Sequence, residues 1–456
     1  MEYLSVSAAQ CCVLESVATL GVETVRLEQS LGRVLAEDIR ANRDLPPYDA
    51  SAMDGFAVRS ADLAGGSVEL VVVEDIKAGD MPTKAVQAGQ CSRIMTGAPV
   101  PQGADAVVRV EDSETLPDGR VRFIKSAPSG MDIRLRGEGM RNGEVVLAAG
   151  VEVTPGVAGV LATVKRAQLR VYRRPRVAIL STGNELEGMD EPVDPDRIPD
   201  ANSYALMAQV QALGIEPVLL GIARDDPAEL ERYLRQGLEY DVLLVSGGTS
   251  VGVHDYVRPT VEALGVQMKF WRVAMKPGHP LAFGVLKRNL LEDSKAVEAD
   301  AVQGARSAAT ETYPQGRRGS EHRATPQCAA ADALVFGLPG NPVSSMVCFE
   351  EFVVPALRRI MGHARLHRRT VSARLAHPVK MRPGRTEFVR VVLSRDGEGY
   401  VATSTGTQSS GALLSMARAD GLLIAPSDSN GLAVGETVTV QLLDGADFQD
   451  ETGYRE

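Results

Sequence analysis

Several loops of this 456-residue chain combine glycine, proline and single charged side chains in a way that suits binding of a phosphate or another oxyanion. The segment SGGTSVGVHDYV follows the apolar run DVLLV and contains Ser246, Gly247, Gly248, Ser250 and Asp255. Glycines have no Cβ atoms to shield the backbone amides, so such a loop can cradle an anion. The same glycines could instead serve a tight turn that only requires a positive φ.

Two further loops carry groups of the same kind. In FGLPGNPVSS, Asn341 is expected to cap a helix with Pro342 in its first turn, and Pro339 and Gly340 precede them. The first turn of a helix presents free amides to an anion. In VAMKPGHPLAFG, the ammonium group of Lys276 could neutralise a phosphate, although a solvated surface lysine is the simpler interpretation.

Acidic side chains recur beside these loops. Glu185 follows the apolar run RVAIL, Asp225 and Asp226 follow EPVLLGIA, and Asp255 follows the glycine loop. One or two carboxylates, with phosphate oxygens and water, are enough to hold Mg²⁺. Asp225 and Asp226 could also be ordinary helix caps, since they stand directly before Pro227. The sequence has no Cys or His cluster for a transition metal, so a hard cation or a metal handled as an oxyanion is favoured.

The elements that would position these loops fall into three regions. Residues 1–172 show an opening helix around Ala8–Leu20 and then short alternating runs joined by turns, which predicts β-strands. In residues 173–363, apolar runs alternate with helical segments, which predicts a parallel sheet covered by helices on both faces. Ligands of such sheets bind beyond the carboxyl ends of the strands, where the loops above would meet. Residues 364–456 read as a small β-barrel or sandwich.

Two features interrupt the second region. Residues 288–332 are polar, rich in Ala, Ser and Arg, and without clear periodicity, which predicts a surface insertion. A disordered loop is the simpler interpretation of this insertion, and a docking segment for a partner protein is the alternative. Pro355 is expected to kink or end the helix that follows FGLPGNP.

Composition excludes several classes of function. The net charge of −10 disfavours nonspecific nucleic-acid binding, which needs a basic surface. No run reaches the roughly 18 apolar residues of a membrane span, and the amino terminus lacks the basic region of a signal peptide. Five cysteines without metal-ligand spacing fit a reducing compartment, so a cytoplasmic protein is expected.

Two stretches near the start of the chain have no generic structural purpose. They are DLPPYDASAMDGFAV at residues 44–58 and RIMTGAPVPQGADAVVRVED at residues 93–112. Together with SGGTSVG, KPG and GLPGNPVS, in this order, they resemble the molybdopterin molybdenumtransferase family, which includes the bacterial MoeA proteins and the gephyrin E domain. The resemblance covers nearly the whole chain apart from the insertion.

This resemblance implies an α/β multidomain fold. An elongated amino-terminal region (1–172) would contain a nested β-rich domain at about residues 45–145. A molybdopterin-binding α/β domain (173–363) and a small carboxy-terminal β-barrel (364–456) would follow.

The resemblance also implies a reaction. Enzymes of this family insert molybdate into adenylylated molybdopterin with Mg²⁺-dependent release of AMP. They act as homodimers with the active site between subunits, and the adenylyltransferase and acceptor molybdoenzymes are the further partners that this implies.

Matching positions assign residues to this reaction. Catalysis would involve Asp54, Glu185, Asp225, Asp255 and Lys276, and the four carboxylates among them would also bind the metal. Substrate binding would involve Thr96, Ser246, Gly247, Gly248, Ser250, His279, Pro339, Gly340, Asn341, Pro342, Arg385 and Ser410. Arg385 lies in RPGRTEF, where a guanidinium group suits an oxyanion.

Two positions depart from the pattern of many relatives. Gly139 stands where they carry an acid, so one contact to metal or molybdate is missing here. His279 stands where they carry a second lysine, and a histidine is charged only part of the time near neutral pH. If His279 contacts phosphate, substrate affinity should therefore fall as the pH rises.

Two other functions are alternatives. The adenylyltransferase of the same pathway shares the α/β domain, but it consumes ATP, usually carries GGTG where this chain has GGTS, and lacks the other two regions. A scaffold without catalysis is the second alternative, because the gephyrin E domain also anchors receptor tails. Retention of Asp54, Glu185, Asp255 and Lys276 favours catalysis.

Overall fold

The computed structural model describes residues 3–248, 256–288 and 332–443, which belong to two compact units. Unit 1 comprises residues 1–23, 32–34 and 171–456, and unit 2 comprises residues 24–31 and 35–170. The predicted site residues Ser250 and Asp255, and nearly all of the predicted insertion, lie outside the described residues. Within the described ranges, no helix is long and apolar enough to cross a membrane.

A six-stranded sheet forms the centre of unit 1, in the order β16-β13-β17-β21-β20-β18. β13 pairs in parallel with β16 and β17, and β17 with β21, which confirms the predicted parallel sheet for these strands. β20 is antiparallel to both of its neighbours, contrary to the prediction. Residues 271–281 join β18 to β20 without a helix, and strands joined without a crossover can run antiparallel. The strands are β13 (Val177–Thr182), β16 (Val218–Ala223), β17 (Val242–Ser246), β18 (Gln267–Phe270), β20 (Ala282–Leu286) and β21 (Ala333–Leu338).

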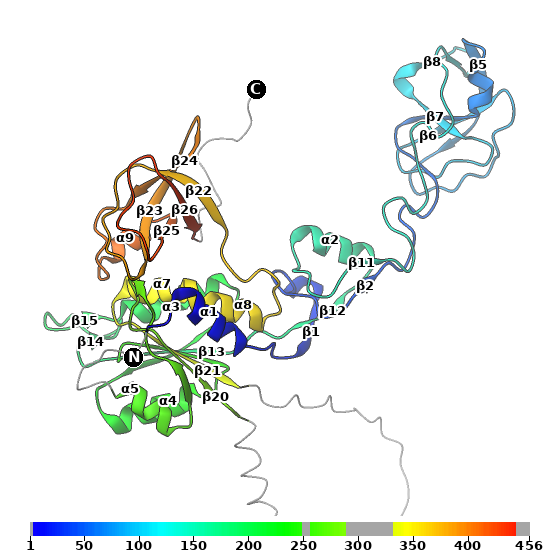
Figure 1. Cartoon of the computed structure of the whole chain (residues 1–456). Helices are drawn as coiled ribbons and strands as arrows, with labels where there is room; N and C mark the ends of the chain where they lie inside the picture. Colours follow the sequence, from blue (N-terminus) through cyan, green and yellow to red (C-terminus); the bar gives the residue numbers. More distant parts are fainter. Residues whose placement is uncertain (1–2, 249–255, 289–331, 444–456) are drawn as a thin grey trace, which may run out of the picture. The chain divides into compact units, whose positions relative to one another are not determined.

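Helices cover both faces of this sheet (Figure 1). Val177 and Ile179 of β13 pack into one apolar cluster, whereas Ala178 and Leu180 pack into another, because successive strand residues point to opposite faces. The first cluster is completed by α1 (Val6–Glu15), α3 (Ala201–Ala212), α7 (Pro342–Cys348) and α8 (Val354–Ile360). The second is completed by α4 (Pro227–Gly237) and α5 (Val257–Ala263).

Pro355 does not end its helix, which continues to Ile360, so this part of the prediction is wrong. A wide π-helical turn, Phe349–Val353, leads directly into α8, and Pro355 occupies the first turn of α8. A proline has no N–H group to donate, so it is tolerated where regular helical hydrogen bonding is already interrupted.

A five-stranded barrel closes the carboxy-terminal part of unit 1, as predicted. The strand order is β23-β24-β22-β26-β25, and β25 pairs back with β23. The two-residue strand β19 (Met275–Lys276) also pairs with β23, which places Lys276 opposite Glu387. The barrel strands are β22 (Thr370–Leu375), β23 (Thr386–Asp396), β24 (Gly399–Ser404), β25 (Gly421–Ala425) and β26 (Thr437–Leu442), with α9 (Leu413–Ala417) before β25. A parallel pair, β14 (Leu186–Glu187) and β15 (Ile198–Pro199), completes the strands of unit 1.

Unit 2 is built on a second six-stranded sheet, in the order β7-β4-β6-β5-β9-β8. Phe56 and Phe123 meet edge to face in its core, with ring centroids 5.8 Å apart. The strands are β4 (Gly55–Val58), β5 (Val68–Ile76), β6 (Gln90–Ile94), β7 (Ala106–Arg109), β8 (Ser113–Thr115) and β9 (Arg120–Phe123). Outside this sheet, β2 (Ile39–Arg40) pairs with β11 (Val145–Leu147), β3 (Ala50–Ser51) pairs with β10 (Ile133–Arg134), and α2 spans Pro155–Thr163. The chain passes between the units within β1 (Val22–Arg26), on either side of residues 32–34, and within β12 (Gln168–Tyr172).

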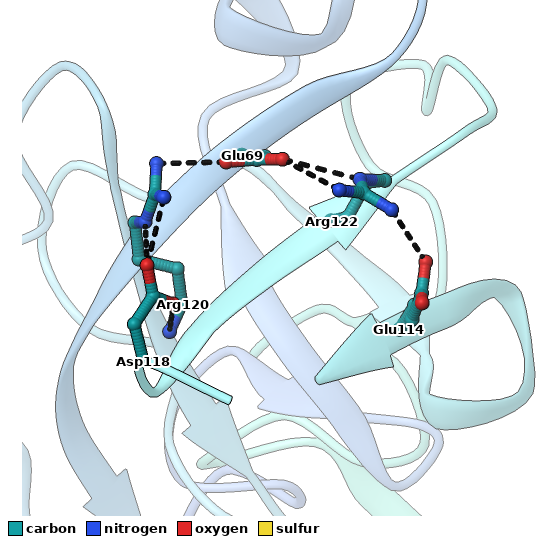
Figure 2. Close-up of polar contacts among 5 residues, drawn as sticks. All are labelled: Glu69, Glu114, Asp118, Arg120 and Arg122. Carbon is teal, nitrogen blue, oxygen red and sulfur yellow. Dashed lines mark hydrogen bonds and ion pairs between the residues drawn. The ribbon is translucent and has the colours of Figure 1, made fainter. Parts of the chain in front are cut away.

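An ion-pair network crosses three neighbouring strands of this sheet (Figure 2). Glu69 of β5 and Glu114 of β8 both lie opposite Arg122 of β9, and each binds its guanidinium group at 2.9 Å. Glu69 also binds Arg120 at 2.7 Å, and Arg120 binds Asp118 at 2.7 Å. Opposite charges at facing positions favour this strand register.

Candidate active site

The carboxyl ends of three parallel strands open into one cavity of about 720 Å³ in unit 1. Thr182 ends β13, Ser246 ends β17, and Pro339 directly follows β21. The structure brings together many of the predicted site residues in this lining: Glu185, Asp225, Ser246, Gly247, Gly248, Pro339, Gly340, Asn341 and Pro342.

The two acids that follow β16 have different surroundings. Asp226 caps α4, because its carboxylate accepts a hydrogen bond from the Glu229 amide at 2.8 Å. Asp225 lines the cavity, and its carboxylate makes no hydrogen bond or ion pair within the described residues. The capping interpretation therefore holds for Asp226, and Asp225 remains available to a ligand.

An arginine that the sequence did not single out holds the Glu185 loop. One terminal nitrogen of Arg224 donates to the carbonyl oxygens of Leu186 at 2.7 Å and of Gly183 at 3.4 Å. Gly183 has a φ of 143°, and a Cβ atom at this position would lie 2.4 Å from a carboxylate oxygen of Glu185. Glycine at this position therefore leaves room for the Glu185 carboxylate.

The glycine loop after β17 passes very close to its neighbours. A Cβ atom on Gly247 would lie 2.6 Å from the Thr182 carbonyl oxygen, and one on Gly248 would lie 2.4 Å from a methyl group of Val257. The Gly247 amide donates to the Leu338 carbonyl at 3.1 Å. In the described structure this amide therefore joins two strand ends, and the contact of Gly247 with an anion stays a prediction.

The first turn of α7 is also partly occupied. Asn341 stands at the capping position, as predicted, but its side chain makes no capping hydrogen bond. The Val343 amide donates to the Ser410 carbonyl at 3.1 Å. Contrary to the expectation, this amide is therefore not free to bind an anion. This bond joins α7 to the barrel loop that contains Ser410, and the next residue, Gly411, lines the cavity.

Two polar side chains of the cavity were missed by the reading of the sequence. Asn202 donates through Nδ2 to the Ser246 hydroxyl and to the Gly340 carbonyl, both at 2.7 Å. Its Oδ1 atom and the Thr182 hydroxyl are buried without a hydrogen-bond partner among the described residues. Buried polar atoms are usually satisfied, so these two suit donor groups of a ligand. In the sequence, Asn202 is only the first residue of the segment NSYALMAQVQALG, which predicts a helix.

A second cavity of unit 1, of about 610 Å³, contains the predicted residues Lys276 and Arg385. Lys380, Arg382 and Glu387 also line it. Lys276 Nζ lies 3.1 Å from both carboxylate oxygens of Glu387, which is almost buried. Four cationic side chains face one carboxylate in this lining, so an anion is favoured there.

His279 is in neither lining, but its ring lies against Tyr3, which lines the second cavity, and the next residue, Pro280, lines the first. The ring centroids are 4.8 Å apart, and His279 Nδ1 lies 3.1 Å from the Val273 carbonyl oxygen, to which it donates. Partial burial lowers the pKa of His279 below its ordinary value of 6.5; the bond to Val273 opposes this shift, and the positive charge of Arg385 adds to it. The positive charge of His279 near neutral pH is therefore smaller than that of an ordinary histidine.

Unit 2 brings the predicted residues Asp54 and Thr96 into direct contact. The Thr96 amide and hydroxyl both donate to the same oxygen of Asp54 at 2.7 Å. These two bonds lower the pKa of Asp54, so its carboxylate is ionised at neutral pH. Gly139 also belongs to unit 2, and its amide donates to the Leu45 carbonyl at 3.0 Å.

A metal ion would find few ligands in the described ranges, where no three His, Cys, Asp or Glu side chains gather closely enough to hold one. Glu185 and Asp225 nevertheless line one cavity, and their oxygen atoms suit a hard cation that keeps several waters. The residues present therefore fit Mg²⁺ completed by water and phosphate oxygens, and do not fit a permanently held transition metal.

Family models match three parts of the chain. The MoeA N-terminal region (domain I and II) matches residues 4–164, and a probable molybdopterin binding domain matches residues 178–359. The MoeA C-terminal region (domain IV) matches residues 372–443.

Individual relatives align over nearly the full length. The molybdopterin molybdenumtransferases of Staphylococcus aureus strains Mu50 and COL are each 30% identical to the chain over 444 residues, covering 96% of this chain and 95% of the relative. A solved molybdopterin biosynthesis moeA protein from Pyrococcus horikoshii OT3 superposes with a TM-score of 0.76 at 26% identity, and a solved molybdopterin biosynthesis moea protein from Pyrococcus horikosii superposes with 0.73 at 30%. Both cover 97% of this chain and 100% of the solved one. The chain belongs to the MoeA family of molybdopterin molybdenumtransferases.

Proposed function

We propose that this protein inserts molybdate into adenylylated molybdopterin and releases AMP. The observation that carries the proposal is the cavity at the carboxyl ends of β13, β17 and β21, lined by two carboxylates in a chain that matches MoeA proteins over nearly its full length. Such strand ends are where open α/β sheets bind their ligands.

Glu185 and Asp225 are the described residues that would hold Mg²⁺ in this cavity. The Asp225 carboxylate makes no competing bond within the described residues, and the Glu185 loop is held by Arg224. When bound, Mg²⁺ would withdraw negative charge from the phosphoanhydride oxygens of the substrate. Asp54 and Asp255 are proposed as further acids of the site on the basis of their matching motifs.

Lys276 and Arg385 would bind the oxyanion. Their cavity carries an excess of cationic side chains, and a guanidinium group can donate two parallel hydrogen bonds to an oxyanion such as molybdate. Glu387 holds the Lys276 ammonium group in place through both carboxylate oxygens. The Thr182 hydroxyl and Asn202 Oδ1 would accept hydrogen bonds from the organic part of the substrate.

The family resemblance also supports finer proposals. We propose a cytoplasmic homodimer with domains at residues 1–172, 173–363 and 364–456 and an active site shared between subunits. The adenylyltransferase and acceptor molybdoenzymes are the proposed partners. Light scattering of the purified protein tests the dimer, and a monomer at working concentration would contradict it.

The decisive experiment measures AMP release from adenylylated molybdopterin, with and without molybdate and Mg²⁺. We expect release that requires both ions and activation of an apo-molybdoenzyme by the product. ATP consumption would favour the adenylyltransferase instead, and no molybdate-dependent release from a folded protein would favour a scaffold.

Asp225→Asn and Asp226→Asn provide a matched pair for this assay. Asp225→Asn removes a cavity carboxylate and should slow AMP release by about 10–100-fold. Asp226→Asn keeps a good helix cap and should leave the rate and the unfolding temperature nearly unchanged. Equal loss of activity in both variants would contradict the assignment of Asp225 to the site.

A further inference from the structure

Arg390 of β23 is a buried cation without an acidic partner. Its side chain is 1% exposed, and no carboxylate pairs with it in the part of the chain that the structure describes. Arginine keeps its charge in proteins. Burying an uncompensated charge opposes folding, so stability alone does not explain an arginine at this position.

The guanidinium group of Arg390 binds one loop through several atoms. Nη2 donates to the Ser409 carbonyl at 3.0 Å and to the Thr407 carbonyl at 3.5 Å. Nε donates to the Ser415 hydroxyl of α9 at 3.2 Å. Among the described residues, the charge is therefore met by the dipoles of residues between β24 and the end of α9.

The backbone of Arg390 is clamped to the same loop. Its amide donates to Gln408 Oε1 at 2.9 Å, and Gln408 Nε2 donates back to the Arg390 carbonyl at 3.1 Å. The Thr405 amide donates to this carbonyl as well, at 3.1 Å. The loop 405–411 is thus fixed from both its main chain and its side chains by one residue of the barrel.

The fixed loop forms part of the cavity described above. Its Ser410 carbonyl accepts the Val343 amide of α7, and Gly411 lines the cavity together with Gly340 and Asn341. Movement of this loop would therefore change the wall that faces the substrate and would break its connection to α7.

We propose that Arg390 is a positioning residue for the substrate, which fixes the loop 405–411 as one wall of the active-site cavity. The proposal rests on the proposed function for the identity of the substrate. The effect of Arg390 on the loop 405–411 can be tested without that function, because the rigidity of the loop can be measured separately.

The test uses the full-length chain with Arg390→Met and Arg390→Lys. Arg374→Met is the matched control, because Arg374 is an exposed barrel arginine paired with Asp396. We expect Arg390→Met to raise the KM for adenylylated molybdopterin about tenfold, the size of one lost charge-assisted hydrogen bond. Arg390→Lys should recover part of this loss, and Arg374→Met should behave as the wild type.

Hydrogen exchange gives a second readout that is independent of activity. In Arg390→Met, the amides of 405–411 and of Val343 should exchange faster, while those of β13 and β17 should not change. If Arg390→Met does not fold, Gln408→Ala removes only the reciprocal clamp and should show the same two effects more weakly.

The outcomes separate the two proposals. A folded Arg390→Met with unchanged KM and unchanged exchange in 405–411 overturns the positioning role. A wild-type protein that releases no AMP, but whose loop 405–411 is loosened by Arg390→Met, overturns the proposed function and leaves the loop assignment standing.

Discussion

At the residue scale, His279 changes the electrostatics that the family pattern implies. The family pattern implies a permanent positive charge at this position, whereas His279 donates from Nδ1 to Val273 and packs at a tilt of 56° against Tyr3. A neutral imidazole with its proton on Nδ1 leaves Nε2 as an acceptor, which cannot bind an ionised phosphate oxygen. The ring can attract an anion only after it takes up a second proton.

We therefore expect titration of His279 to leave the wild-type KM unchanged between about pH 7 and 8.5. The KM should fall only at lower pH, where His279 takes up a proton. The lowered pKa places protonation below the ordinary value of 6.5, so positive charge appears as the pH falls. His279→Lys, charged throughout, should bind substrate more tightly at pH 8. Steady-state kinetics of wild type, His279→Lys and His279→Gln check this. This expectation is contradicted if the wild-type KM rises steadily from pH 7 to 8.5 while the KM of His279→Gln does not.

Asp225 and Asp226 show that residue types alone do not decide which of two neighbouring acids caps a helix. Both acids precede Pro227, so the sequence allows either one to cap the helix. Which carboxylate meets the Glu229 amide depends on backbone angles that no local pattern encodes, because Asp226 is extended at this point. The Gly247 amide is a similar case, since its use by Leu338 depends on a strand about 90 residues further along the chain.

At the element scale, buried strands were predictable and their direction was not. The apolar runs of β13, β17 and β21 stand out because both faces of each strand are covered. β20 is equally apolar, yet it runs the other way. Direction follows from the connections on either side of a strand, and the residues of the strand itself do not specify it.

The ion-pair network of unit 2 gives a prediction at this scale. Glu69→Gln should lower the free energy of unfolding of the sheet by about 1 kcal/mol or less, because the side chains of the network are partly exposed and their charges are screened by water. Phe123→Ala should lower it by about 3–5 kcal/mol, because it leaves a cavity beside Phe56. The effect of Glu69→Gln should shrink further in high salt.

Hydrogen exchange of the β5 and β9 amides measures both changes in the full chain. Trp271, the single tryptophan, lies in unit 1, so its fluorescence reports that unit separately and should not respond. A Glu69→Gln effect as large as that of Phe123→Ala would mean that the network, and not the aromatic core, holds the sheet together.

At the scale of the whole chain, contacts between distant segments are harder to predict from the sequence than changes of hydrophobic period. Changes of hydrophobic period mark regions along the sequence. The pairing of β19 with β23, and hence the contact of Lys276 with Glu387, joins segments more than 100 residues apart. Such contacts follow from packing of the finished fold. This is why the sequence placed Lys276 beside the glycine loop, whereas the structure places it in a second cavity.

Glu351 is a buried residue that joins three parts of unit 1. It lies in the π-helical turn before α8. Gln10 of α1 donates to its carbonyl at 3.0 Å, and Gln441 of the barrel donates to its Oε1 at 2.8 Å. Burial raises the pKa of Glu351 to about 8; the bond from Gln441 opposes this shift, and the charge of Glu350 adds to it. The folded protein therefore keeps this carboxyl group protonated at neutral pH.

This protonation makes the stability of unit 1 depend on pH. The unfolded carboxyl ionises near 4.5 and the folded one near 8, so stability should fall as the pH rises between these values, by about 5 kcal/mol or less. Glu351→Gln keeps the shape of the side chain and cannot ionise. The difference in free energy of unfolding between this variant and the wild type should therefore grow in favour of the variant from about pH 5 to 8 and then stay constant. Urea unfolding followed by Trp271 fluorescence measures it. A constant difference between the two proteins across this range would mean that Glu351 is ionised in the folded state.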